Sequence, residues 1–201
     1  MSFVSPLLAG LLVLALASCA SAPVALVALP GAPPAAKRDA RPGVSVLVRD
    51  VTVPAYLDSF PVVIGRDGAA LVVSKDTEWA ERPSAGVARV LRDALSERLD
   101  ASRVLVAGER RIPDVDLTVE FVALDPQAGA LHLEARWHFS CTAVRGSHAG
   151  RSRLDVPLAA ATPAAVAVAT TAALARFADV LVDAIPAECR AHSEDVARTR
   201  R

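Results

Sequence analysis

The 201-residue chain lacks the short motifs by which the common enzyme classes are identified. It has no G-x-S-x-G nucleophile elbow, no glycine-rich phosphate loop and no cysteine near a histidine motif. Its four histidines are not spaced with cysteine or aspartate as zinc ligands are. Basic and acidic residues balance, 22 against 22, so no excess positive charge points to a nucleic-acid partner. We therefore expect a protein that is not an enzyme and needs no cofactor or metal.

Cysteine is also scarce, and the first of the three cysteines ends a long apolar run. Residues 7–18 read LLAGLLVLALAS, and Leu16-Ala17-Ser18 before Cys19 fits the bacterial lipobox. The small side chains admit the signal peptidase, and the thiol after the cut accepts a diacylglycerol. We expect residues 1–18 to be a lipoprotein signal peptide that is cleaved between Ser18 and Cys19. The mature chain would then be held to a membrane by acyl chains on Cys19, without spanning it.

Two other interpretations of the apolar run stay open. It could be an uncleaved transmembrane helix, although about 16 apolar residues fall short of the roughly 20 that a bilayer needs. It could also be an ordinary secretory signal in which the cysteine is coincidental, and residues 1–6 lack the usual lysine or arginine. Ala20 after the cysteine permits transfer to the outer membrane, whereas aspartate there would favour retention in the inner membrane. An outer-membrane anchor is therefore expected, with inner-membrane anchoring as the alternative.

The rest of the chain divides into a tether, one domain and a tail. Residues 19–42 carry Cys19 and a stretch rich in proline and alanine, which predicts a flexible tether because its five prolines disfavour a helix. The apolar residues 24–29 within it could instead form a first edge strand. Residues 43–186 are long enough for one domain with its own core. Residues 187–201 are polar and are expected to fray as a C-terminal tail.

Within the domain the apolar pattern predicts strands, a helix, more strands and a second helix. Apolar and polar residues alternate most clearly over residues 131–139, as in a sheet with one buried face. Asp67-Gly68 and residues 125–129 predict hairpin turns. Helical spacing runs over 84–99, with Ser84 as N-cap, and over 163–185 after Thr162. We therefore expect an α+β fold in which two helices pack on one face of a mainly antiparallel sheet.

The other two cysteines are expected to meet. Cys141 ends a predicted strand, and the last helix should bring the chain back to the same end of the sheet just before Cys189. A disulfide between them suits an oxidising compartment. A disulfide that closes a loop of this length would add roughly 3 to 4 kcal/mol to the free energy of unfolding in the chain-entropy model.

Two short motifs point to a family. Residues 51–58 read V-T-V-P-A-Y-L-D, and Trp79-Ala80-Glu81 precedes the helical pattern L-x-x-x-L-S-x-R-L over 91–99. In this order, over about residues 40–186, the chain resembles the ABC-type transport auxiliary lipoprotein family, which includes the lipoprotein of the paraquat-inducible operon. The resemblance implies a periplasm-facing, non-catalytic lipoprotein. Its partners would be an MCE-domain (mammalian cell entry) protein with an ABC permease and ATPase. We also expect assembly into a homo-oligomeric ring.

Three residues of these motifs are candidates for contact with a partner. Tyr56 and Leu57 follow a proline and could be an exposed contact, because aromatic residues are enriched at interfaces, or a packed loop anchor. Trp79 could contact a partner or could simply belong to the core. An alternative function for the whole chain is an envelope assembly lipoprotein, of the lipopolysaccharide-assembly or pilotin-like kind, with no transport partner.

Overall fold

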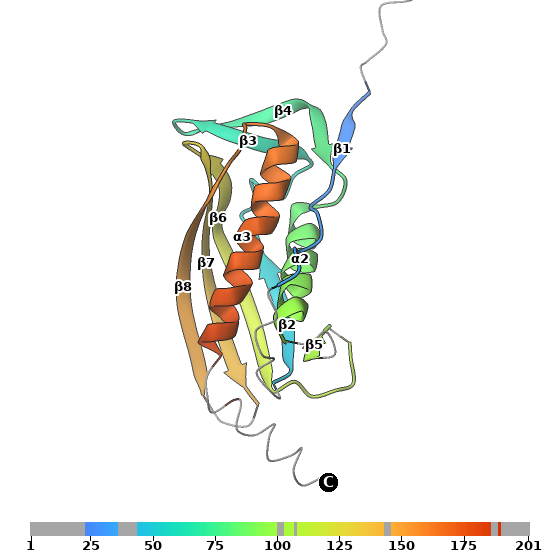
Figure 1. Cartoon of the computed structure of the whole chain (residues 1–201), viewed down its shortest axis with the longest axis vertical. Helices are drawn as coiled ribbons and strands as arrows, with labels where there is room; N and C mark the ends of the chain where they lie inside the picture. Colours follow the sequence, from blue (N-terminus) through green and yellow to red (C-terminus); the bar gives the residue numbers. More distant parts are fainter. Residues whose placement is uncertain are drawn as a thin grey trace, which may run out of the picture.

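A computed structural model describes residues 23–35, 44–99, 103–106, 108–142, 146–185 and 189. The predicted signal peptide, Ser18 and Cys19 lie outside the described residues, as does the predicted tail apart from Cys189. The described chain has the α+β fold that the sequence predicts, with two helices and two sheets (Figure 1).

The larger sheet has five strands. In spatial order they are β5 (Val104–Leu105), β2 (Val46–Thr52), β6 (Val115–Gln127), β7 (Ala130–Cys141) and β8 (Ser147–Pro157). The alternation in β7 is confirmed, because Leu131, Leu133, Ala135 and Phe139 are buried while the residues that alternate with them are more exposed. Where β8 passes Trp137 the chain has Gly150, since a Cβ there would overlap the indole ring.

Two helices cover one face of this sheet, as predicted (Figure 1). α2 (Pro83–Leu99) and α3 (Pro163–Ala184) pack against each other and bury their apolar stripes. The Thr162 hydroxyl accepts a hydrogen bond from the amide of Ala165, so it caps α3 as predicted. α3 is long and apolar enough to cross a membrane, but 67% of its most apolar window is buried, as expected of a core helix.

The smaller sheet has three strands and lies across one end of the helices (Figure 1). Its spatial order is β1 (Ala25–Val27), β4 (Ala70–Trp79) and β3 (Pro61–Asp67). The predicted hairpin joins β3 to β4, and Gly68 takes a left-handed conformation with φ of +58°. The described strands therefore form two sheets, where the sequence analysis expected one.

The expectation of a mainly antiparallel sheet is only partly right. β2 runs parallel to both β5 and β6, and β1 runs parallel to β4. The reason is the connection after β2, which passes through the β3–β4 hairpin and α2 before the chain returns. A crossover of this kind brings the next strand back in the same direction. The antiparallel pairs are β3–β4, β6–β7 and β7–β8.

The segment expected to be a flexible tether is in part a structural element of the domain. β1 pairs with β4, and Val27 accepts a hydrogen bond from the amide of Ala80 at 2.8 Å. Leu29 is 6% exposed and belongs to the main core. The alternative prediction of an edge strand over 24–29 is therefore the one the structure supports. Burial of Leu29 and the parallel pairing outweigh the disorder that the prolines suggested.

Candidate functional site

The two motifs that carry the family resemblance meet where the two sheets and the start of α2 come together. The amide of Trp79 donates to the carbonyl of Phe60 at 2.7 Å, which holds the end of β4 beside the loop that follows β2. Leu57 and Trp79 line the same cavity, together with Leu29, Val87 and Val166. Its volume is about 30 Å³, room for one or two water molecules. The junction is thus a packed apolar joint, too small to hold an organic ligand in this conformation.

A charged cluster joins the two sheets beside this joint. The Arg66 guanidinium on β3 forms a short ion pair with Asp125 on β6, whose carboxylate is fully buried. The Tyr56 hydroxyl donates to the same carboxylate at 3.2 Å, and Arg66 lies 5.2 Å above the centre of the Tyr56 ring. Partial burial, followed by the charge of Asp125, raises the pKa of Tyr56. The phenol therefore stays protonated and acts as a donor.

Asp58, the last residue of the first motif, holds the start of α2. The carboxylate of Asp58 accepts a hydrogen bond from the amide of Ser84 at 3.0 Å, and the Arg82 guanidinium donates to the Asp58 carbonyl. α2 begins at Pro83, so Ser84 lies in its first turn and is not the N-cap expected from the sequence. The cap comes instead from Asp58, 26 residues earlier in the chain.

Glu81, the end of the second motif, acts through Arg89. The two side chains form an ion pair, and Arg89 also donates to the carbonyl of Leu29 at 3.1 Å. Thr171 on α3 donates to the next carbonyl, that of Pro30, at 3.1 Å. The N-terminal segment is thereby bonded to both helices. Both motifs serve to fix β1 and α2 to the rest of the domain.

The three residues predicted as contacts with a partner are all engaged within the domain. Leu57 is 9% exposed and faces the cavity, which matches the packed-anchor alternative. Trp79 is half-buried and packs against the core, which matches the plain core alternative. Tyr56 is 39% exposed, with its hydroxyl directed at Asp125. Contact with a partner stays a prediction for the exposed part of the Tyr56 ring.

Sequence reasoning missed the roles of Arg66 and Asp125. Asp125 belongs to the segment 125–129 that predicts a hairpin turn, and Arg66 directly precedes the predicted turn at Asp67-Gly68. They are 59 residues apart, and no spacing rule relates them. The one signal in the sequence is that Asp125 follows the apolar alternating stretch 115–124 directly, where a carboxylate needs a buried partner.

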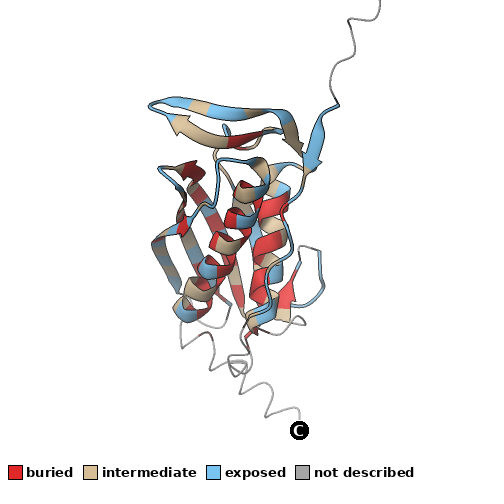
Figure 2. Cartoon of the chain, turned by 45° about the horizontal axis from the view of Figure 1, so that its top comes forward, coloured by how far each residue is buried: buried red, intermediate tan, exposed pale blue. Residues whose placement is uncertain are grey.

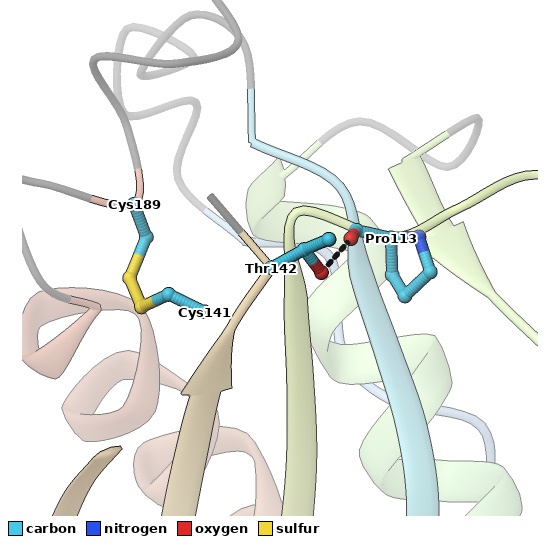
Figure 3. The surroundings of a disulfide bond; sticks show 4 residues. All are labelled: Pro113, Cys141, Thr142 and Cys189. Atoms are coloured by element: carbon cyan, nitrogen blue, oxygen red, sulfur yellow. Dashed lines mark hydrogen bonds between the residues drawn. A yellow bond between two sulfur atoms is a disulfide. The ribbon is translucent and has the colours of Figure 1, made fainter. Parts of the chain in front are cut away.

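The opposite end of the five-stranded sheet holds the disulfide. The structure joins Cys141, the last residue of β7, to Cys189 after α3, with their Cα atoms 5.5 Å apart (Figure 3). Next to it the Thr142 hydroxyl donates to the carbonyl of Pro113 at 2.6 Å. Both cysteines are buried, with 6% and 1% of their surface exposed. This bond fixes the chain after α3 to the sheet.

The outer face of the five-stranded sheet carries charged side chains in ion pairs. Glu134 accepts from Arg151 and Arg153, and the His132 imidazole contacts the carboxylate of Asp155. His138, on the same strand as His132, is exposed. Among the described residues no group of three or more His, Cys, Asp or Glu side chains could hold a metal ion.

Removing the Arg66 guanidinium should destabilise the domain, because it leaves the Asp125 carboxylate buried without its cation. For Arg66→Ala we expect a loss of about 3 kcal/mol in the free energy of unfolding, measured by urea denaturation at pH 7. Arg49→Ala is the matched control, since its pair with Asp116 is more exposed and should contribute less than about 1 kcal/mol. Equal losses for the two variants would contradict this assignment.

Comparisons with known proteins agree with this fold. Residues 28–182 match the family described as "ABC-type transport auxiliary lipoprotein component". A crystal structure titled only as an uncharacterized protein is similar with a TM-score of 0.65 and 16% identity, over 82% of this chain and 100% of that one. A DUF330 protein from Xanthomonas campestris is similar with a TM-score of 0.59 and 18% identity, over 79% and 92%. No curated protein matches the sequence significantly. The family match covers most of the chain, which therefore belongs to the ABC-type transport auxiliary lipoprotein component family.

Proposed function

We propose that the protein is a non-catalytic, periplasm-facing lipoprotein subunit of an MCE-type ABC lipid transport system that maintains the outer membrane. The observation that carries the proposal is the family match over residues 28–182, which follows closely on the lipobox at Cys19. The family works beside an ABC transport system, and the lipobox supplies the membrane anchor. An MCE-domain protein, with its permease and ATPase, is the partner that this combination fits.

The chemistry of the described residues supports a role that depends on contacts. Arg66 and Asp125 are engaged with each other and with Tyr56, and Asp58 and Glu81 hold the start of α2. The apolar cavity at the junction is too small for a substrate. The function of the protein then depends on the membrane position that its anchor gives it and on the surface that it presents to partners. A ring of identical copies is the assembly we propose.

Affinity purification tests the proposed partner. A C-terminally tagged protein, extracted from membranes in mild detergent, should recover the MCE subunit, and the same purification from cells without the MCE gene controls for background. Separation of inner and outer membranes by density should place the tagged protein in the outer membrane. Recovery of outer-membrane barrel proteins alone, without an MCE subunit, would favour an envelope assembly lipoprotein and overturn the proposal. Light scattering of the purified protein tests the ring.

A further inference from the structure

The N-terminal strand is bonded to the domain only a few residues after the predicted lipid site. β1 begins at Ala25 and is fixed by its pairing with β4 and by the burial of Leu29. Six residue steps separate Ala25 from Cys19, and a fully extended chain of that length spans at most about 21 Å. A lipidated Cys19 would thus hold β1 close to the membrane surface. A long free tether would let the domain move far from the membrane.

The far end of the domain lies about the length of a long strand away from this anchored end. β6 runs from Val115, beside Cys141, to the Asp125 region next to the smaller sheet. The ten residue steps between Val115 and Asp125 alone cover roughly 33 Å. Figure 1 shows β1 and the smaller sheet at one end of the molecule, and β5 with the end of α3 at the other. The smaller sheet is therefore the membrane-proximal end.

The smaller sheet presents apolar side chains on the face turned away from the core. Val27 and Trp79 are paired in register and pack inward, so Leu26 beside Val27 points outward. Leu26 is 67% exposed, and Val24, on the same side of β1, is 51% exposed. On β4 the neighbouring Leu71 packs against the core, so Val72 points outward, and it is 41% exposed. Figure 2 shows this end of the molecule turned forward, and it is mostly exposed or half-buried.

Charges on this sheet set the depth at which it can lie. Glu78 is paired in register with Leu26, and Asp76, two residues before it, is exposed. Hydrogen bonds from the Ser74 and Thr77 hydroxyls lower the pKa of Asp76. A charged carboxylate does not enter the hydrocarbon region without a large cost. Leu26 and Val24 can reach the boundary between headgroups and acyl chains while the two carboxylates stay in water.

We propose that the outer face of the sheet β1–β4–β3 lies against the lipid bilayer that holds the acyl chains of Cys19. This rests on the lipid anchor in the proposed function, and it adds a defined orientation. The lipid surface contacts Val24, Leu26 and Val72. The end that carries the Cys141–Cys189 disulfide points away from the membrane, where it is free for protein partners.

Site-specific fluorescence tests the orientation. Leu26→Cys, Val72→Cys and the control Ile112→Cys are each labelled with an environment-sensitive NBD dye on the lipidated protein. Ile112 is 79% exposed and lies three residues before β6, at the far end. The native cysteines are occupied by the disulfide and by the lipid, so labelling is selective. Each protein is placed in vesicles of phosphatidylethanolamine and phosphatidylglycerol, with or without nitroxide-labelled lipid.

The dye at positions 26 and 72 should shift to shorter wavelength and be quenched by nitroxide lipid several times more strongly than the dye at 112. Equal emission and quenching at all three positions, on a protein that carries palmitate, would overturn the orientation and leave the proposed function intact. The same blue shift without vesicles would also overturn it, because another protein copy would then cover the face. Lack of palmitate on the wild-type protein would overturn both proposals.

Discussion

A Cys19→Ser variant is expected to fold like the wild-type domain but to leave the membrane fraction almost completely. Serine keeps the size of the residue but removes the thiol that accepts the diacylglycerol. Each acyl chain contributes about 0.8 kcal/mol per buried CH₂, and stable anchoring needs more than one such signal. With no acyl chain, the exposed apolar residues of the smaller sheet are too few to hold the domain to a bilayer.

Fractionation of cell envelopes and incorporation of labelled palmitate measure this loss directly. Ser18→Ala is the matched control, because alanine is also small and should leave cleavage and lipidation unchanged. Thermal unfolding of the Cys19→Ser protein should match that of the wild-type domain, which separates lost anchoring from lost folding. Transport in cells should fail for Cys19→Ser alone. Full transport by this soluble form would mean that the anchor is incidental to function.

The strands and helices that have one solvent-exposed face could be predicted from the sequence, because their hydrophobic pattern is local. In β7 the alternation of Leu131, Leu133 and Phe139 with polar residues specifies a half-buried strand without reference to its neighbours. The stripe of α3 and its Thr162 cap are local in the same sense. These elements were predicted to within a few residues of their observed bounds.

The division into two sheets could not be predicted, because pairing depends on residues far apart. β1 has three residues and is followed closely by Pro30, so its composition resembles a tether. It is a strand because β4 offers a parallel edge and the core has a place for Leu29. A hydrophobic pattern shows that a strand has a buried face, but it does not identify the neighbouring strand or its direction.

The candidate site shows the same limit. The two motifs pointed to Tyr56, Leu57 and Trp79, and these residues do lie at the junction of the sheets. Their partners, the half-buried Arg66 and the buried Asp125, stand beside turn-forming residues, so the local sequence indicates only turns there. Only the folded chain brings the two charges together, and their pairing explains why a carboxylate can lie at the end of β6.

Removal of the disulfide should cause the second large effect, this time on stability. The bond between Cys141 and Cys189 closes a sequence separation of 48 residues, which corresponds to about 4 kcal/mol in the chain-entropy model. For a domain of this size, 1 kcal/mol shifts the melting temperature by about 2 to 4 °C. A Cys141→Ala/Cys189→Ala variant should therefore melt roughly 8 to 16 °C below the wild-type protein by circular dichroism.

The reductant dithiothreitol supplies the matched control for this comparison. It should lower the melting temperature of the wild-type domain toward that of the double variant and leave the double variant unchanged. A wild-type domain that is insensitive to the reductant would contradict the assignment. So would mass mapping of an envelope preparation, without reductant, that finds both thiols free.

The same disulfide should make the stability of the domain depend on the cellular compartment in which the protein folds. Disulfides form in the oxidising envelope and are rare in the reducing cytoplasm. If the protein is exported as we propose, we expect the domain to reach its full stability only after export. A form without residues 1–18, made in the cytoplasm, should show the lower melting temperature of the double variant when it is purified under reductant. Oxidation of that sample in vitro should recover the higher value, because Cys141 and Cys189 already lie at the same end of the sheet. A cytoplasmic sample that shows the higher value while its thiols are still reduced would mean that the bond adds nothing to the fold.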